Sequence, residues 1–226
     1  MGFLYLVVYN IVYHIGAKLS RADDSFDRRY GTDTRQVREI GSLDANRAAA
    51  ARWAVRYEPS SAKLVWEILE RLKIDYSRYS FIDFGSGKGR VLLIAGQFNF
   101  NEVLGIEFSR ELHEIALQNI ALLPPGADRA GKIQSVHGDA TSLELPKSDL
   151  VCYFYNPFGP PILSHVAAKL VAHHERYGNQ IIVIYHNARH REVFESTKKF
   201  TIFDEIGNTL LLSTLPHAGL AAVDIC

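Results

Sequence analysis

The sequence predicts an α/β protein with a doubly wound, mostly parallel seven-stranded sheet, a C-terminal antiparallel β-hairpin and an N-terminal helical arm. Two observations support this fold class. From Ser80 onward, short apolar runs alternate with helical patterns and short connections, which is typical of a parallel sheet wound by crossover helices. Near the end, residues 200–206 and 209–215 are strand-like and are separated by Gly207-Asn208, which suits a two-residue hairpin turn.

The other elements follow from local patterns. Short apolar runs predict strands at 80–84, 102–107, 133–137, 150–155 and 180–185. Helical spacing predicts helices at 61–73, 90–97, 110–122, 160–174 and 191–197. The run 150–155 is apolar throughout, as expected of a strand buried on both faces.

The first part of the chain has a different composition. Residues 20–58 are polar and arginine-rich, and we expect an irregular arm with one helix from Ser42 to Ala51. The expected division of the chain is therefore an arm at 1–58, one α/β domain at 59–216 and a tail at 217–226.

A glycine-rich turn joins the first predicted strand of the domain to the helix after it. The run 83–89 reads Asp-Phe-Gly-Ser-Gly-Lys-Gly. Glycine allows a positive φ and lets a ligand touch the main chain, and a helix N-terminus behind such a turn suits a nucleotide-like ligand. A dinucleotide fold has the spacing G-x-G-x-x-G, whereas here the third glycine comes one position early, at Gly89. We expect the neighbouring Lys88 and Arg90 to be surface charges.

This D-x-G-x-G-x-G run resembles the class I S-adenosylmethionine (SAM) methyltransferases, which have a Rossmann-like sheet of seven strands ending in a hairpin. The resemblance covers residues 60–215 and implies that the domain binds SAM as its cofactor. It implies that Asp83 orders the turn by accepting hydrogen bonds from the backbone or water, and that Glu107 binds the ribose hydroxyls. The remaining implied SAM-binding residues are Gly85, Ser86, Gly87 and Gly89 in the turn, and Asp139 and the Ala140 amide at the adenine.

A second resemblance concerns the methyl acceptor. Asn156-Pro157-Phe158 is similar to the [Asp/Asn]-Pro-Pro-aromatic motif of methyltransferases that modify amino nitrogens, which implies a catalytic role for these three residues. Tyr57 lies in a segment that resembles the Tyr-x-Pro segment before the first helix of seven-strand methyltransferases, which implies that it helps to wall the substrate channel and belongs with the catalytic residues. In Asn156-Pro157-Phe158 the aromatic residue comes one position earlier than in the motif, and the second proline is missing. The acceptor therefore stays open between a protein lysine, another amine and another nucleophile.

Two other function classes also stay open: a nicotinamide-dependent oxidoreductase, and a binding module that keeps the fold without turnover. A nucleic-acid partner is not expected, because 25 basic and 25 acidic residues give no overall basic field. Nor is a metal site expected, since His186 and His190 lack the glutamate of the zinc-protease motif.

Residues 3–19 form an apolar helical stripe that is shorter than the ~20 residues of a bilayer span. This helix is expected to dock on the domain, to associate with a second copy of the chain, or to lie on a membrane surface. The two cysteines, Cys152 and Cys226, do not make a disulfide framework. We therefore expect a reduced, cytoplasmic protein, peripheral to the membrane if the helix is an anchor.

Overall fold

The structure is a computed structural model that describes residues 24–35, 58–124, 126 and 128–216. The helices expected at 3–19 and 42–51, and the tail at 217–226, lie outside the described residues. Within the described part, no helix is long and apolar enough to cross a bilayer.

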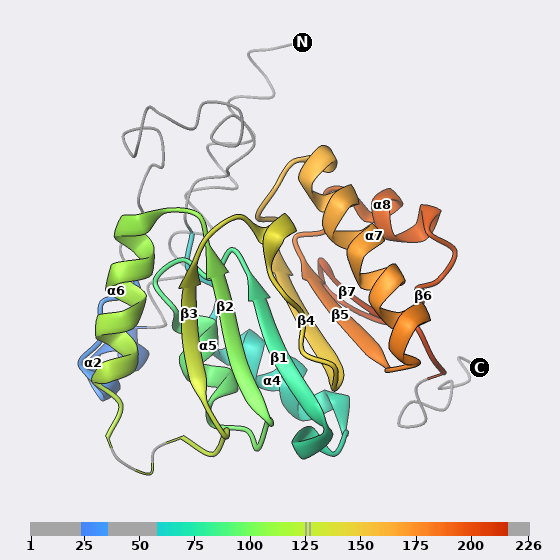
Figure 1. Ribbon diagram of the computed structural model, residues 1–226. Coiled ribbons are helices and arrows are strands. Elements are labelled where there is room, and N and C mark those ends of the chain that lie inside the picture. The colour runs from blue at the N-terminus through green and yellow to red at the C-terminus, as the bar shows by residue number, and fades with distance from the viewer. Residues whose placement is uncertain (1–23, 36–57, 125, 127, 217–226) are drawn as a thin grey trace.

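A seven-stranded sheet forms the centre of the domain, in the order β3-β2-β1-β4-β5-β7-β6 (Figure 1). The first five strands in the chain are parallel, and β7 runs antiparallel to both β5 and β6. The predicted fold class and the terminal hairpin are thus confirmed. The strands are β1 (Tyr79–Phe84), β2 (Glu102–Glu107), β3 (Ile133–His137), β4 (Asp149–Tyr155), β5 (Ile181–His186), β6 (Thr201–Ile206) and β7 (Thr209–Ser213).

Helices cover both faces of this sheet. They are α2 (Asp24–Tyr30), α4 (Ala62–Leu72), α5 (Arg90–Ala95), α6 (Arg110–Ala121), α7 (Pro160–Tyr177) and α8 (Arg191–Ser196), with short 3₁₀ turns η4 (Tyr76–Arg78) and η5 (Ala140–Ser142). Helix α7 runs three residues further than expected and ends at Gly178, which has φ +66°. Helix α2 was not predicted, because its sequence is mostly polar and only its packing on the domain buries Phe26.

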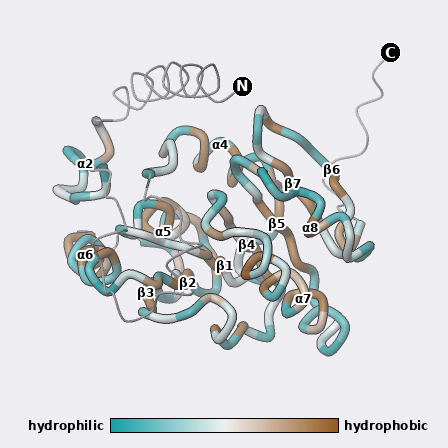
Figure 2. The backbone as a smooth tube through the Cα atoms, turned by 90° about the horizontal axis from the view of Figure 1, so that it is seen from above, coloured by the Kyte–Doolittle hydropathy of each residue, from teal (hydrophilic) through white to brown (hydrophobic). Residues whose placement is uncertain are grey.

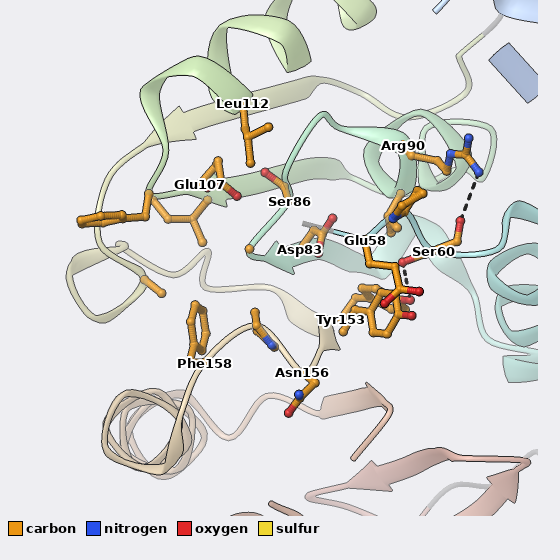
Figure 3. Close-up of a pocket in the computed structure, with 18 of the residues that line it drawn as sticks. Glu58, Ser60, Asp83, Ser86, Arg90, Glu107, Leu112, Tyr153, Asn156 and Phe158 are labelled. Carbon is orange, nitrogen blue, oxygen red and sulfur yellow. Dashed lines mark hydrogen bonds between the residues drawn. The ribbon is translucent and has the colours of Figure 1, made fainter. Parts of the chain in front are cut away.

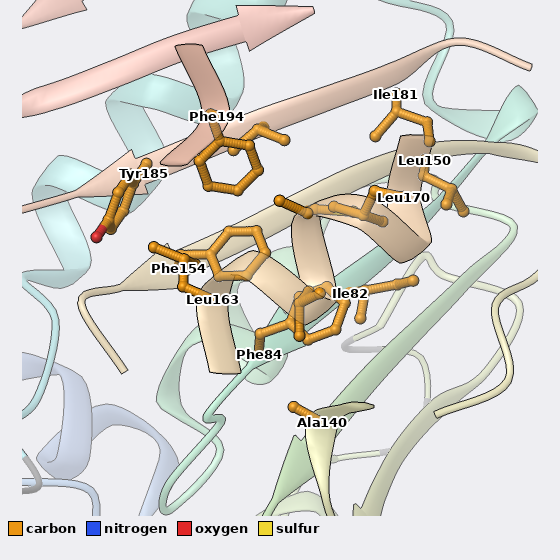
Figure 4. Packing of buried hydrophobic residues seen from close by; sticks show 14 of the residues in the cluster. Ile82, Phe84, Ala140, Leu150, Phe154, Leu163, Leu170, Ile181, Tyr185 and Phe194 are labelled. Carbon is orange, nitrogen blue, oxygen red and sulfur yellow. The ribbon is translucent and has the colours of Figure 1, made fainter. Parts of the chain in front are cut away.

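The core consists of two apolar clusters, one on each face of the sheet. Alternate residues of a strand point to opposite faces, so Phe81 packs with α4 and α5, whereas Phe84 packs with α7 and α8. Figure 2 shows α4 and α5 on one side of the strands and α7 on the other. In the second cluster, the rings of Phe84 and Phe154 stack with centroids 4.7 Å apart (Figure 4).

The strand order fixes where a ligand can enter. After β3 the chain returns to the other side of β1 to form β4, so the helices after β1 and β4 lie on opposite faces of the sheet. A crevice opens at the carboxyl ends of the strands where the order reverses in this way. The glycine-rich turn after β1 and the Asn156-Pro157 turn after β4 both lie at this point.

Candidate functional site

A cavity lies at the carboxyl ends of β1, β2 and β4 (Figure 3). Its lining includes five residues that the sequence singled out around the glycine turn and the strand ends, namely Asp83, Gly85, Ser86, Glu107 and Ala140. It also includes Asn156, Pro157 and Phe158. In Figure 3, Glu107 and Ser86 lie on one side of the cavity, and Asn156 and Phe158 on the other. The structure thus brings members of both predicted groups to one cavity, whereas Gly87, Gly89 and Asp139 lie outside its lining.

Glu107, the last residue of β2, is buried and holds the glycine turn from inside the cavity. One carboxylate oxygen accepts a hydrogen bond from the Gly87 amide at 2.8 Å, and the other accepts from the Ser109 amide at 2.7 Å. Burial raises the pKa of Glu107, and these backbone hydrogen bonds oppose the rise because they favour the charged form. Each oxygen keeps a lone pair with which to accept from a ligand hydroxyl.

The turn approaches the opposite wall of the cavity closely at Gly85. This residue has φ +86°, and a Cβ placed on it would lie 2.7 Å from the Cβ of Pro157. The amides of Gly85 and Ser86 both donate to the carbonyl of Ile106, which ties the turn to β2. Gly89 has a different role, since a Cβ there would meet Ala116 of α6 at 3.2 Å rather than the cavity.

Ser86 offers an unused hydrogen-bonding group to the cavity. Its hydroxyl oxygen is buried and has no hydrogen-bond partner among the described residues. A buried polar group without a partner is costly, and a ligand that supplies the missing partner removes that cost. The residues at the turn therefore fit a ligand that carries hydroxyl or carboxylate groups.

Asp83 lies at the end of β1, with its side chain almost fully buried. Burial, with a contribution from the charge of Glu107, raises the pKa of Asp83 well above its ordinary value. Among the described residues, Glu107 and not Asp83 accepts the hydrogen bond of the Gly87 amide, so the expectation that Asp83 orders the turn by accepting from the backbone or water stays a prediction. Asp83 is left as a buried carboxyl that lines the cavity and that a cationic ligand group would favour in its charged form.

The raised pKa predicts a pH-dependent stability that Asp83→Asn removes. Protonated Asp83 stabilises the folded state, and its contribution to the free energy of unfolding is fully present below the ordinary pKa of 3.8. This contribution is lost as the pH rises through the raised pKa of the folded protein. Glu107 and Tyr153 face Asp83 from the neighbouring strands and are unchanged in the variant. We expect the Tm of Asp83→Asn without ligand to match the wild type near pH 4 and to exceed it increasingly toward pH 8. A Tm difference that stays constant over this range would contradict the assignment.

Asp139 and Ala140 directly follow Gly138 after the end of β3. Ala140 and Gly138 line the cavity, whereas Asp139 lies between them, outside the lining. One oxygen of Asp139 accepts from the amide and the hydroxyl of Thr141, both at 2.8 Å, and so caps η5. A contact from Asp139 to an adenine stays a prediction.

The Asn156-Pro157-Phe158 turn forms the wall opposite Glu107. Asn156 is buried and has φ +42°, a strained conformation for a residue with a side chain. Among the residues that the structure describes, its side-chain oxygen accepts one long hydrogen bond, 3.5 Å from the Tyr185 hydroxyl. Phe158 is half-buried beside it. Asn156 and Phe158 thus line the cavity together, while Tyr57 lies outside the described residues.

Lys88 and Arg90 are not surface charges, which corrects the expectation from the sequence. The Lys88 side chain is wholly buried and Arg90 is 4% exposed. Lys88 forms an ion pair with Asp33 at 2.9 Å, and Arg90 donates to the hydroxyl of Thr34 at 2.7 Å. Both partners lie in the N-terminal arm, more than fifty positions earlier in the chain, so no local pattern could reveal them.

Several lining residues were missed from the sequence. Tyr155 is the last residue of β4, directly before Asn156, and Asn187 and Arg189 follow β5. The rule that ligands bind at the carboxyl ends of parallel strands would have found all three. Burial and the nearby charge of Glu58 raise the pKa of Tyr155, so its phenol stays protonated at neutral pH.

In the described part of the chain, no three metal-ligating side chains gather in a way that could hold an ion.

Comparisons with known proteins agree with this architecture. A scan against protein-family models and a search of curated proteins both find no match. Among solved structures, a ribosomal protein L11 methylase from Lactobacillus delbrueckii subsp. bulgaricus is similar, with 18% identity, a TM-score of 0.50, and coverage of 70% of this chain and 79% of that one. A predicted N6-adenine-specific DNA methylase from Listeria monocytogenes str. 4b F2365 has 15% identity, a TM-score of 0.51 and coverage of 69% and 51%.

These likenesses concern the fold. Together with the strand order and the antiparallel β7, they show that the chain has the class I, Rossmann-like methyltransferase fold.

Proposed function

We propose that this protein is a SAM-dependent methyltransferase, which transfers a methyl group from SAM to an acceptor nucleophile. The observation that carries the proposal is the buried Glu107 carboxylate, fixed at the end of β2 by the Gly87 amide and facing the same cavity as Asp83 and Gly85. A carboxylate in this position suits a pair of ribose hydroxyls, and a turn without side chains suits main-chain contact with a ligand.

The residues at the cavity offer a candidate partner for each part of SAM. Glu107 would accept hydrogen bonds from the ribose hydroxyls, and Asp83 would face the positive charge of the methionine end. Ser86, whose buried hydroxyl has no partner among the described residues, would donate to the ligand. The Ala140 amide, and in the prediction Asp139, would meet the adenine. When bound, SAM supplies an electrophilic methyl group on its sulfonium.

The opposite wall would hold the acceptor. Methyl transfer requires a neutral, desolvated nucleophile in line with the methyl group, so positioning supplies most of the barrier reduction. The amide oxygen of Asn156 is suited to accept a hydrogen bond from an amino group, and the ring of Phe158 to pack beside it. We propose an amine, such as a protein lysine, as the acceptor.

Asn156→Ala tests the acceptor assignment. It removes the amide oxygen while Glu107 and the glycine turn remain, so SAM affinity should stay within about twofold. Methyl transfer to the acceptor should fall by roughly 10²-fold or more, because a misplaced acceptor loses its alignment. Radiolabelled SAM and a lysate as acceptor source measure transfer, and calorimetry measures affinity. A parallel loss of SAM affinity would instead place Asn156 at the cofactor.

The terminal hairpin disfavours the oxidoreductase alternative. A nicotinamide fold made of two repeated halves would continue with another crossover helix where this chain forms β6 and β7. A binding module without turnover would have the same SAM site, and it differs from the proposed enzyme only in that it transfers no methyl group.

The proposal includes a cytoplasmic location, which the buried free thiol of Cys152 supports.

Titration of the protein with SAM, S-adenosylhomocysteine and NADH tests the proposed function. We expect heat of binding with the first two ligands and none with NADH. Binding of NADH alone would overturn the proposal in favour of the oxidoreductase. Binding of SAM without label transfer to any acceptor fraction would favour the binding module.

A further inference from the structure

The segment 24–35 at the start of the described chain contacts the glycine turn through residues outside the cavity lining. Lys88 is the central contact, and its ammonium meets both carboxylate oxygens of Asp33, at 2.9 and 3.0 Å. The Lys88 side chain is wholly buried, whereas that of Asp33 is half-exposed. Because a buried ammonium is unfavourable without a counter-charge, Asp33 compensates the charge of Lys88 inside the protein.

Asn119 of α6 closes this cluster by bonding to both partners. Its side-chain amide donates to the carbonyl of Lys88 at 2.9 Å and to the carbonyl of Asp33 at 3.1 Å. In return, its oxygen accepts from the amide of Asp33 at 2.9 Å. The segment, the turn and α6 are thereby joined through one residue of the turn.

Arg90 makes a second connection, from the segment to the cavity wall. Its guanidinium donates to the Thr34 hydroxyl at 2.7 Å and to the Ser60 carbonyl at 3.3 Å. The Ser60 hydroxyl in turn accepts from Tyr153 at 2.9 Å, and both of these residues line the cavity (Figure 3). The segment therefore contacts both the turn and the wall beside it.

The turn is thus held from two sides. Inside the cavity, Glu107 holds the Gly87 amide, and outside it, Asp33 holds the next residue, Lys88. Gly87 and Gly89, on either side of Lys88, have φ +52° and +82°. Glycine adopts positive and negative φ about equally readily, so these residues do not by themselves fix the conformation of the turn. The bond within the turn from the Gly89 amide to the Ser86 carbonyl, at 2.9 Å, and the contacts from Glu107 and Asp33 therefore select its conformation together.

We propose that residues 24–35 are a positioning element of the cofactor site, in which Asp33 acts through Lys88 to hold the glycine turn in its ligand-binding conformation. This inference rests on the proposed function and adds to it a part of the chain that lies outside the cavity.

A charge-balanced double variant separates positioning from stability. Asp33→Ala alone removes the carboxylate that meets the buried ammonium and should lower the Tm. Asp33→Ala combined with Lys88→Met removes both charges and should regain most of that Tm. The affinity of the double variant for S-adenosylhomocysteine should nevertheless remain about tenfold weaker than that of the wild type, a typical coupling between sites.

Two further variants complete the test. Asn119→Ala removes the contacts to the Lys88 carbonyl without uncovering a charge, and it should weaken affinity in the same direction. The control is a distant ion pair, in which Arg71 and Asp204 lie 2.7 Å apart. The double variant Arg71→Met with Asp204→Ala removes this pair and should leave the affinity for S-adenosylhomocysteine unchanged.

The outcomes are distinguishable by calorimetry at a temperature well below every Tm. Wild-type affinity in the double variant overturns the positioning role and leaves the proposed function standing. So does wild-type affinity in Asn119→Ala, provided that this variant has the same Tm as the wild type. Absence of binding to the wild type itself overturns the proposed function, and this inference with it.

Discussion

Glu107→Gln is expected to weaken SAM binding by about 1.5–3 kcal/mol, the scale of hydrogen bonds to a charged group. The variant keeps the shape of the side chain and removes its charge. One of its two positions becomes an NH₂ group, which would face the amide of Gly87 or of Ser109 donor to donor. The loss therefore affects both the contact with the ribose and the hold on the glycine turn.

Glu102→Gln is the matched control for this variant. Glu102 is the first residue of the same strand, at the amino-terminal end of the parallel strands and away from the cavity. Its carboxylate accepts a hydrogen bond from the Ser80 hydroxyl at 3.2 Å. Calorimetry should show wild-type SAM affinity for this control. Unchanged affinity in Glu107→Gln would remove Glu107 from the site.

Gly85→Ala should give the largest loss of stability among the substitutions considered. A side chain at φ +86° costs about 1–2 kcal/mol, and the contact with Pro157 adds about 1–3 kcal/mol of overpacking. Relief of the contact must move Pro157, and Asn156 with it. SAM affinity and methyl transfer should fall together as a result.

Gly178→Ala isolates the backbone contribution. Gly178 has φ +66° at the end of α7, and a Cβ there would meet nothing within 4 Å. Urea unfolding should therefore show a smaller loss for this variant than for Gly85→Ala, with unchanged SAM affinity. Equal losses in the two variants would mean that the turn does not press against Pro157.

The sequence predicted the sheet well because its signals are local. The apolar runs from β1 to β5 and the Gly207-Asn208 turn each reveal their structure within a few residues. Glu107 was found because it ends a strand, and parallel strands place their carboxyl ends at one edge.

The unpredicted parts depend on contacts between distant segments. Lys88 and Arg90 resemble surface charges in the sequence, and only the folded chain brings Asp33 and Thr34 to them. Helix α2 shows the same dependence, since Phe26 is buried through the domain core and lies under the guanidinium of Arg90. Sequence periodicity does not report such pairings.

The acceptor side was predicted in part. Asn156 and Phe158 do line the cavity, but the residues after β5 were considered only as metal ligands. Asn187 has φ +51° and faces the same cavity, so a second strained asparagine lies near Asn156. Backbone strain of this kind is visible only in the structure.

A crystal structure of the full chain with S-adenosylhomocysteine at saturating concentration tests the central claim most directly. We predict that the ribose hydroxyls lie within hydrogen-bond distance of Glu107, with the amino-acid end over the turn at Gly85 and the adenine beside Ala140. A ligand bound elsewhere, or an empty cavity at saturation, would contradict the account.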